Sequence, residues 1–96
     1  MKMRSIVVNE LHVTDWVRYR DYQEQVPATL ELFDGRYVSR GAPEPIVGDA
    51  PSPRVVVLEF PSREHALSWF HSPEFQAILA IRNEASTSRV YFLEGE

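Results

Sequence analysis

The stretch Arg54-Val-Val-Val-Leu-Glu-Phe60 decides the fold of this chain. Its run of four aliphatic residues from Val55 to Leu58 predicts a short strand that is covered on both faces, and therefore one in the middle of a sheet. Ser62 follows closely, and its hydroxyl is suited to cap the N-terminus of a helix. We therefore expect a central strand that leads directly into a helix.

The segments on either side extend this pattern. Residues 5–13 are rich in Val, Ile and Leu and predict a first strand, which ends where Thr14-Asp15 offers cap oxygens to a helix. Apolar residues from Trp16 to Phe33 recur with a helical period, and Pro27 within them predicts a kink or a short break. Two further strands are expected, at residues 36–40 and 89–93.

Prolines and a serine mark the interruptions. Four prolines and a glycine between residues 42 and 53 predict a loop, within which Ile46-Val47 is expected to form a brief edge pairing. Ser72-Pro73-Glu74 predicts that the second helical region restarts there, because serine caps, proline suits the first helical position and an acid suits the first turn.

The predicted order is βαββαβ on a chain of 96 residues, which we interpret as one domain over residues 1–96. This order predicts an α+β, ferredoxin-like fold: a four-stranded antiparallel sheet with two helices on one face. Alternation along the strands assigns the following residues to the other, open face: Ile6, Val8, Glu10, His12, Arg36, Val38, Arg40, Val55, Val57, Glu59, Arg89, Tyr91 and Leu93. The middle of that face is too apolar for water, so we expect a second sheet to cover it.

Composition excludes several classes of protein. The 10 basic and 14 acidic residues give a net charge of −4, which argues against a nucleic-acid or anionic-membrane partner. The absence of cysteine excludes disulfides and cysteine nucleophiles. The apolar run after Met1–Ser5 is too short for a signal peptide or a membrane span, so we expect a cytoplasmic protein.

Several local motifs resemble those of one family. They are Glu59-Phe60-Pro61-Ser62, Ala66, Trp69-Phe70, Ser72-Pro73-Glu74-Phe75-Gln76 and Arg82, with Val13-Thr14-Asp15, Tyr22, Gly35-Arg36-Tyr37 and Arg40-Gly41 upstream. On these residues the chain resembles the DUF1330 family, whose function is unknown. It departs from the family pattern at Ala42, where a second glycine is common, and at Phe75, where a tyrosine is common. The resemblance implies a homodimeric α/β barrel, with an unknown small molecule bound between the sheet and the helices.

Six residues are candidates for a site. Glu59 ends the central strand on the same predicted face as Arg40, and we expect the two to pair, either as a structural bridge or as an anion-binding and proton-handling pair. Arg82 is a second candidate anion-binding group, or else a surface salt-bridge partner of Glu74 or Glu84. The remaining candidates are His12 and Tyr22 for proton transfer and Trp69 for substrate binding.

No metal or cofactor is expected. His12, His65 and His71 lack the spacing of a local metal site. Asn9, Trp69 and His71 are similar in type to a set found in haem-degrading relatives, but Trp69 and His71 are too close in sequence for that pattern.

The sequence therefore leaves two functions open, one catalytic and one not. The first is a cofactor-independent isomerase or oxygenase that acts on a small anionic or carbonyl-bearing metabolite. The second is a non-catalytic ligand-binding or structural dimer module.

Overall fold

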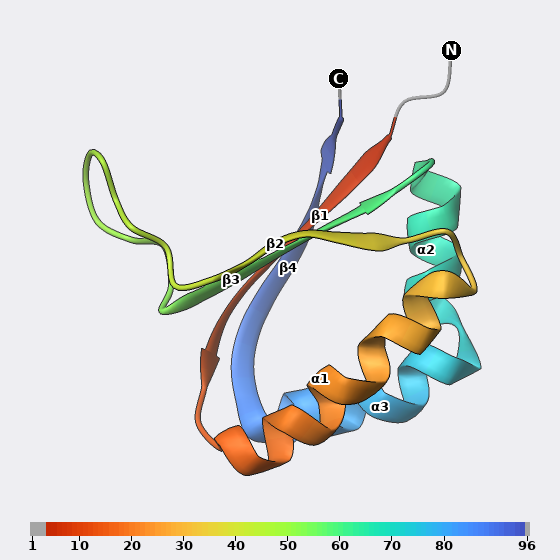
Figure 1. Ribbon diagram of the computed structural model, residues 1–96, viewed down its shortest axis with the longest axis horizontal. Helices are drawn as coiled ribbons and strands as arrows, with labels where there is room; N and C mark the ends of the chain where they lie inside the picture. The colour runs from red at the N-terminus through yellow and green to blue at the C-terminus, as the bar shows by residue number, and fades with distance from the viewer. Residues whose placement is uncertain (1–3, 96) are drawn as a thin grey trace.

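The computed structural model describes residues 4–95, and all of its helices lie on one side of a single sheet (Figure 1). The elements in chain order are β1 (Ser5–Val13), α1 (Trp16–Glu31), β2 (Arg36–Gly41), β3 (Arg54–Phe60), α2 (Arg63–His71), α3 (Pro73–Ala85) and β4 (Ser86–Glu94). This arrangement confirms the predicted α+β, ferredoxin-like fold. Residues 1–3, on which part of the signal-peptide argument depends, lie outside the described residues.

The four strands are antiparallel and lie in the order β2-β3-β1-β4. The predicted central strand β3 therefore lies between β2 and β1, as its uninterrupted apolar run requires. β4 begins at Ser86, three residues earlier than predicted, because it follows α3 directly without a turn.

The helices begin at the predicted caps. Asp15 accepts a hydrogen bond from the Arg18 backbone N–H at 3.1 Å, and Ser62 accepts one from the His65 backbone N–H at 3.2 Å. α1 continues through Pro27, so the expected break does not occur. Its burial of Val26 and Leu30 on either side of the proline offsets the lost backbone hydrogen bond.

The second helical region restarts at Ser72, as predicted, and Ser72 divides it into α2 and α3. Its backbone is extended (φ −65°, ψ 147°), the conformation favoured before a proline. The Ser72 hydroxyl donates to the Trp69 carbonyl at 2.7 Å and accepts from the Phe75 N–H at 3.1 Å, so one side chain ends α2 and begins α3. The fold class predicted two helices, and this restart accounts for the third.

Aromatic packing joins the helices to the sheet. Phe60 and Phe75 are fully buried, and the Trp69 ring lies between them with centroid distances of 5.3 and 4.0 Å. The Trp69 indole N–H donates to Thr29 Oγ1 at 3.0 Å, and Thr29 in turn donates to the Val26 carbonyl at 2.7 Å. These contacts connect β3, α2 and α3 to α1.

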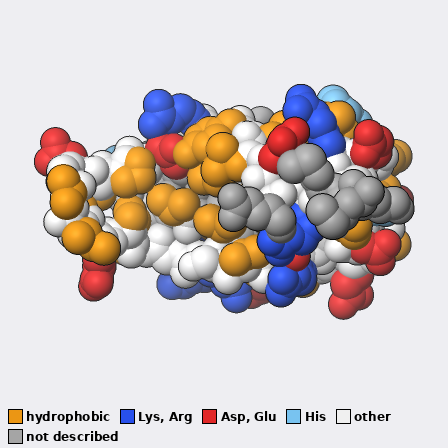
Figure 2. Space-filling view, turned by 90° about the horizontal axis from the view of Figure 1, so that it is seen from above, with side chains coloured by type: hydrophobic (Ala, Val, Ile, Leu, Met, Phe, Trp, Pro, Cys, Tyr) orange, Lys and Arg blue, Asp and Glu red, His pale blue; other side chains and the backbone are white. Residues whose placement is uncertain are grey.

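The opposite face of the sheet carries no helix (Figure 1). Pairing of β1 with β3 and β4 places its side chains in three rows, which are Glu59-Ile6-Leu93, Val57-Val8-Tyr91 and Val55-Glu10-Arg89. Figure 2, which looks down on the molecule from the side away from most of the helices, shows hydrophobic side chains gathered in the middle with charged side chains around them. We call the surface formed by these three rows the open face.

The loop of residues 42–53 extends well beyond the sheet (Figure 1). It holds no strand, so the expected pairing at Ile46-Val47 is wrong, and these two side chains are 98% and 91% exposed. In the part of the chain that the structure describes, no helix has the length and apolar character to cross a membrane.

Gly35 is required by the aromatic packing. A Cβ at this position would lie 2.8 Å from Phe60 Cζ and 2.9 Å from Phe60 Cδ1, and the buried Phe60 ring has no room to move away. Gly35→Ala is therefore expected to lower the free energy of unfolding by about 1–3 kcal/mol. The cost should shrink when Phe60→Leu is also present, which a double-mutant cycle from denaturant unfolding measures. An equal cost in both backgrounds would contradict this explanation.

Candidate functional site

A cavity lies between the inner face of the sheet and the three helices. Its empty volume is about 480 Å³ including its opening to solvent. It consists of narrow crevices that hold only about one or two waters in their present shape. Its apolar walls are Val7, Val26, Val56, Leu58, Phe70 and Val90, and its polar lining residues are Asn9, Tyr19, Tyr22, Gln23, Tyr37, Arg40, Arg54, Trp69 and Arg82. Among these lining residues three are arginines and none is an aspartate or glutamate.

Arg82 projects into this cavity from α3 and is only 6% exposed. Within the described residues it forms no salt bridge, and its buried Nε has no hydrogen-bond partner. The predicted alternative of a surface salt bridge is wrong, because Glu84 pairs with Arg18 and Arg82 is not at the surface. A buried guanidinium without a carboxylate is costly and attracts an anion.

Tyr22 lies in the same cavity on α1. Burial raises the pKa of its hydroxyl well above the ordinary value of 10, and the nearby charge of Arg82 offsets only part of that effect. The phenol is therefore protonated at neutral pH. It is able to donate a hydrogen bond to a bound oxygen atom but not to act as a general base.

Arg40 also reaches the cavity, although alternation along the strand predicts the open face. The pairing of β2 with β3 shifts between Tyr37 and Ser39, so that Tyr37 is opposite Leu58 and Arg40 is opposite Val56. This bulge at Val38 turns Arg40 toward the helices. Its guanidinium lies 4.5 Å from the centroid of the Tyr37 ring, which holds it against the cavity wall.

Trp69 contributes an aromatic wall from α2. Its indole N–H is already bonded to Thr29, so only the ring surface remains for a bound molecule. Phe75, where the family pattern has a tyrosine, is fully buried beside Tyr22 and Trp69. It brings no polar group to this site.

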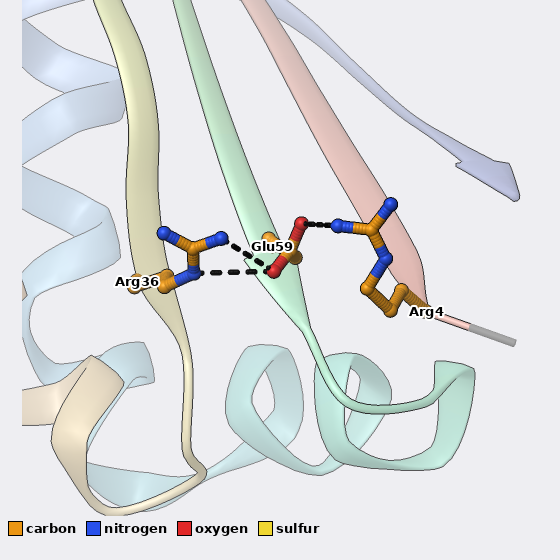
Figure 3. Close-up of polar contacts among 3 residues, drawn as sticks. All are labelled: Arg4, Arg36 and Glu59. Carbon is orange, nitrogen blue, oxygen red and sulfur yellow. Dashed lines mark hydrogen bonds and ion pairs between the residues drawn. The ribbon is translucent and has the colours of Figure 1, made fainter. Parts of the chain in front are cut away.

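Glu59 does not pair with Arg40. Its carboxylate lies on the open face between Arg36 of β2 and Arg4, which precedes β1 (Figure 3). Arg36 donates to Glu59 Oε1 from two nitrogens, at 3.1 and 2.9 Å, and Arg4 bonds the other oxygen. The Glu59 side chain is 12% exposed. The predicted Arg40–Glu59 pair is therefore wrong, because the strand register places Arg36 opposite Glu59 and Arg40 opposite Val56, three residues farther along β3.

His12 is likewise remote from the cavity. It is exposed near the end of β1, where it borders a shallow hollow with Glu10 and Arg89. Arg89 and Tyr91 donate to the two Glu10 oxygens at 2.7 and 2.5 Å. These bonds, that from Tyr91 foremost, hold the pKa of the Glu10 carboxyl below its ordinary value of 4.5 and raise the pKa of Tyr91.

The structure thus brings Tyr22, Arg40, Trp69 and Arg82 together and leaves Glu59 and His12 on the opposite face. Within the described chain no three His, Asp or Glu side chains are grouped as metal ligands.

Sequence reasoning did not select five further polar residues of the cavity, which are Asn9, Tyr19, Gln23, Tyr37 and Arg54. Asn9 and Arg54 stand out among them, because each has a buried polar atom without a partner. Asn9 is opposite Val56 and Val90, in the middle of an inward row of side chains. The sequence alone could have identified Asn9 and Arg54, because each is a polar residue at an inward position of an otherwise apolar strand.

Comparison with known proteins places the chain in a family. Residues 5–96 match a family described as a domain of unknown function, DUF1330. No curated protein matches significantly.

Solved structures share the fold at low identity. A protein of unknown function from Rhodopseudomonas palustris, RPA0582, is 16% identical with a TM-score of 0.77 over 97% of this chain and 82% of its own. SnoaB, a cofactor-independent oxygenase from Streptomyces nogalater, is 14% identical with a TM-score of 0.73 over 98% and 94%. A protein from Bacteroides fragilis described as dimeric, with a ferredoxin-like fold, is 18% identical with a TM-score of 0.60 over 98% and 94%.

A double-mutant cycle tests the ion pairs of Glu59. Arg36→Ala and Glu59→Gln are expected to couple by about 0.5–1 kcal/mol in the free energy of unfolding, because a nearly buried carboxylate receives two bonds from Arg36. Arg40→Ala with Glu59→Gln is the matched control and should show additive effects. All variants are unfolded in denaturant at one protein concentration. Coupling to Arg40 and not to Arg36 would contradict the assigned register.

Proposed function

We propose that this chain, which belongs to the DUF1330 family of unknown function, binds a small anionic or carbonyl-bearing metabolite in the cavity between its sheet and helices. We propose further that it acts on that metabolite as a cofactor-independent isomerase or oxygenase, as a homodimer in the cytoplasm. The chemistry of the cavity supports the binding step most strongly.

The burial of Arg82 without a carboxylate carries this proposal. Salt bridges satisfy arginines elsewhere in the chain, including Arg18, Arg36 and Arg89. Inside the cavity, where the charge of Arg82 is least screened, no described acidic side chain offsets it. A bound anion would supply the missing negative charge and accept the free Nε–H bond.

The same groups suit a reaction that develops negative charge on oxygen. Isomerisation of a carbonyl compound and oxygenation of an enolisable one both pass through an enolate or phenolate. Donors already aimed at that oxygen lower the barrier, because they need no rearrangement as the charge forms. We assign the anion-binding role to Arg82 and Arg40, hydrogen-bond donation to Tyr22, and contact with the apolar part of the substrate to Trp69.

The fold likeness to SnoaB supports a catalytic function for such a cavity, because that protein is described as a cofactor-independent oxygenase. A shared fold does not transfer a reaction, so the assignment depends on the cavity's own residues. Glu59 and His12 are not assigned a role there, since both are on the opposite face. A catalytic role for either stays a prediction about the open face.

One observation favours the alternative of a non-catalytic binding module. No Asp, Glu or His side chain is among the described residues that line the cavity. Tyr22 does not replace them as a base, because burial raises the pKa of its phenol and keeps it protonated at neutral pH. A catalysed reaction would therefore start from a ligand that is acidic enough to enter as an anion. A binding module has no such requirement.

The proposed dimer would bury the open face against its copy. Val57, Val8 and Tyr91 form its middle row, which is apolar apart from one hydroxyl and carries no helix. Neighbouring side chains bury Val8, whereas Tyr91 is 39% exposed. Solved relatives described as dimeric have the same fold, which supports a second copy as the cover.

Val57→Glu tests the dimer. Wild type is expected to sediment at about twice the chain mass of 11.1 kDa, and Val57→Glu as a monomer, because the charge would be buried in the middle of the interface. Val17→Glu, on a 77% exposed position of α1, is the matched control and should remain dimeric. Sedimentation equilibrium measures all three. A monomeric wild type would contradict the proposal.

Turnover is tested with a panel of small carboxylates and enolisable ketones. Hydrogen–deuterium exchange at the α-carbon, followed by NMR, detects enolate formation, and oxygen uptake detects oxygenation. We expect one of these activities, and at least a tenfold loss in Arg82→Met; Arg18→Met, which changes an exposed arginine, should retain it.

Binding without either activity would favour the binding module. Failure of every panel member to bind would contradict the anion site itself.

A further inference from the structure

Asn9 is a buried amide without a complete set of partners. It lies on central strand β1, is 6% exposed, and lines the cavity. Its Oδ1 is buried and has no hydrogen-bond partner within the described chain. Its cross-strand neighbours Val56 and Val90 are both apolar, so the inward row offers this oxygen no donor. An unmatched buried acceptor of this kind costs about 1–3 kcal/mol.

The polar atoms around the cavity that lack hydrogen-bond partners include both an acceptor and donors. Asn9 Oδ1 requires a donor, whereas the buried Nε atoms of Arg82 and Arg54 each require an acceptor. These three are the only buried side-chain atoms without partners in the described chain, and all belong to residues that line the same cavity. Because all three residues border one cavity, a single bound molecule could supply the missing hydrogen-bond partners.

We propose that Asn9 determines the specificity of this cavity, and that its ligand is a hydroxyl-bearing anion whose acidic group meets Arg82 and whose hydroxyl donates to Asn9 Oδ1. This inference rests on the proposed anion site and names its ligand class. The walls formed by Trp69 and Phe70 suit an apolar body between the two polar groups. The narrowness of the cavity restricts that body to a small one.

A water molecule is the simplest other donor to Asn9. One water would satisfy Oδ1 but would leave the charge of Arg82 uncompensated, because water carries none. A ligand with a carboxylate and a hydroxyl satisfies both residues at once. It therefore gains from two groups that the empty protein leaves unmatched.

Matched carboxylates test the proposal. Two series of small acids are titrated by NMR: acetate, glycolate and methoxyacetate, and butyrate, 3-hydroxybutyrate and 3-methoxybutyrate. The methoxy compounds keep the oxygen but cannot donate. In at least one series, we expect the hydroxyl compound to bind about tenfold more tightly than its methoxy partner.

Asn9→Leu should abolish that preference while leaving carboxylate binding dependent on Arg82. It should also melt no lower than wild type without ligand, because an apolar side chain relieves the unmatched oxygen. Asn83→Leu, the same change at an exposed position of α3 that does not line the cavity, is the matched control and should retain the preference.

Each other outcome overturns the role of Asn9, the anion site, or both. Equal binding of all members of both series by wild type would refute the role of Asn9 and leave the anion site standing. Binding of no carboxylate, or equal binding by Arg82→Met, would refute the anion site together with this inference. A lower melting temperature for Asn9→Leu with unchanged preference would make Asn9 a structural residue only.

Discussion

The packing of Trp69 between Phe60 and Phe75 joins the helices to the sheet and so fixes the shape of the space between them. It joins β3, α2 and α3 at ring-centroid distances of 5.3 and 4.0 Å, and the indole N–H bonded to Thr29 adds α1. The Phe60 ring packs directly against Gly35, which has no side chain, so the turn before β2 also contacts this aromatic cluster. The aromatic cluster therefore holds apart the sheet and helices that border the cavity, and gives the polar groups there a rigid frame.

That frame divides the charged residues into two populations. On the open face, carboxylates and arginines are matched, as in Glu59 with Arg36 and Glu10 with Arg89. Toward the cavity, Arg82 and Arg54 have buried Nε atoms without partners, and no acidic side chain faces them in the described chain. Buried groups of this kind reduce stability, and proteins retain them where function needs them. This contrast is the basis for our proposal of a binding site beneath the sheet.

The sequence was sufficient for most of the fold. Hydrophobic periodicity identified the central strand β3, and the cap residues Asp15, Ser62 and Ser72 identified where helices begin. It failed at Val38, because a β-branched residue in a strand carries no local sign of a bulge. That single extra residue turned Arg40 to the inner face. The predicted pair failed for a second reason, the register, which places Arg36 opposite Glu59 and Arg40 opposite Val56, although all these residues lie in the predicted strands.

The sequence predicted those cavity residues whose positions depend on local helical spacing, and it missed those whose positions depend on contacts between distant segments. Tyr22, Arg82 and Trp69 follow from helical spacing, and all three line the cavity. Asn9 and Arg54 are polar residues at inward positions of otherwise apolar strands. They become candidates for ligand binding only when the structure shows that the opposite elements provide no hydrogen-bond partner for Asn9 Oδ1 or Arg54 Nε. Cross-strand register and the identity of a missing partner are tertiary properties, which no single segment encodes.

Bromide is the most direct probe of whether the cavity is an anion site built around Arg82. Bromide is small enough for the narrow space and is located in a crystal by its anomalous scattering. In crystals soaked in sodium bromide we expect an anomalous peak inside the cavity, in contact with Arg82, and none there in Arg82→Met. Peaks confined to exposed arginines such as Arg18 and Arg89, with the cavity empty of bromide, would contradict it.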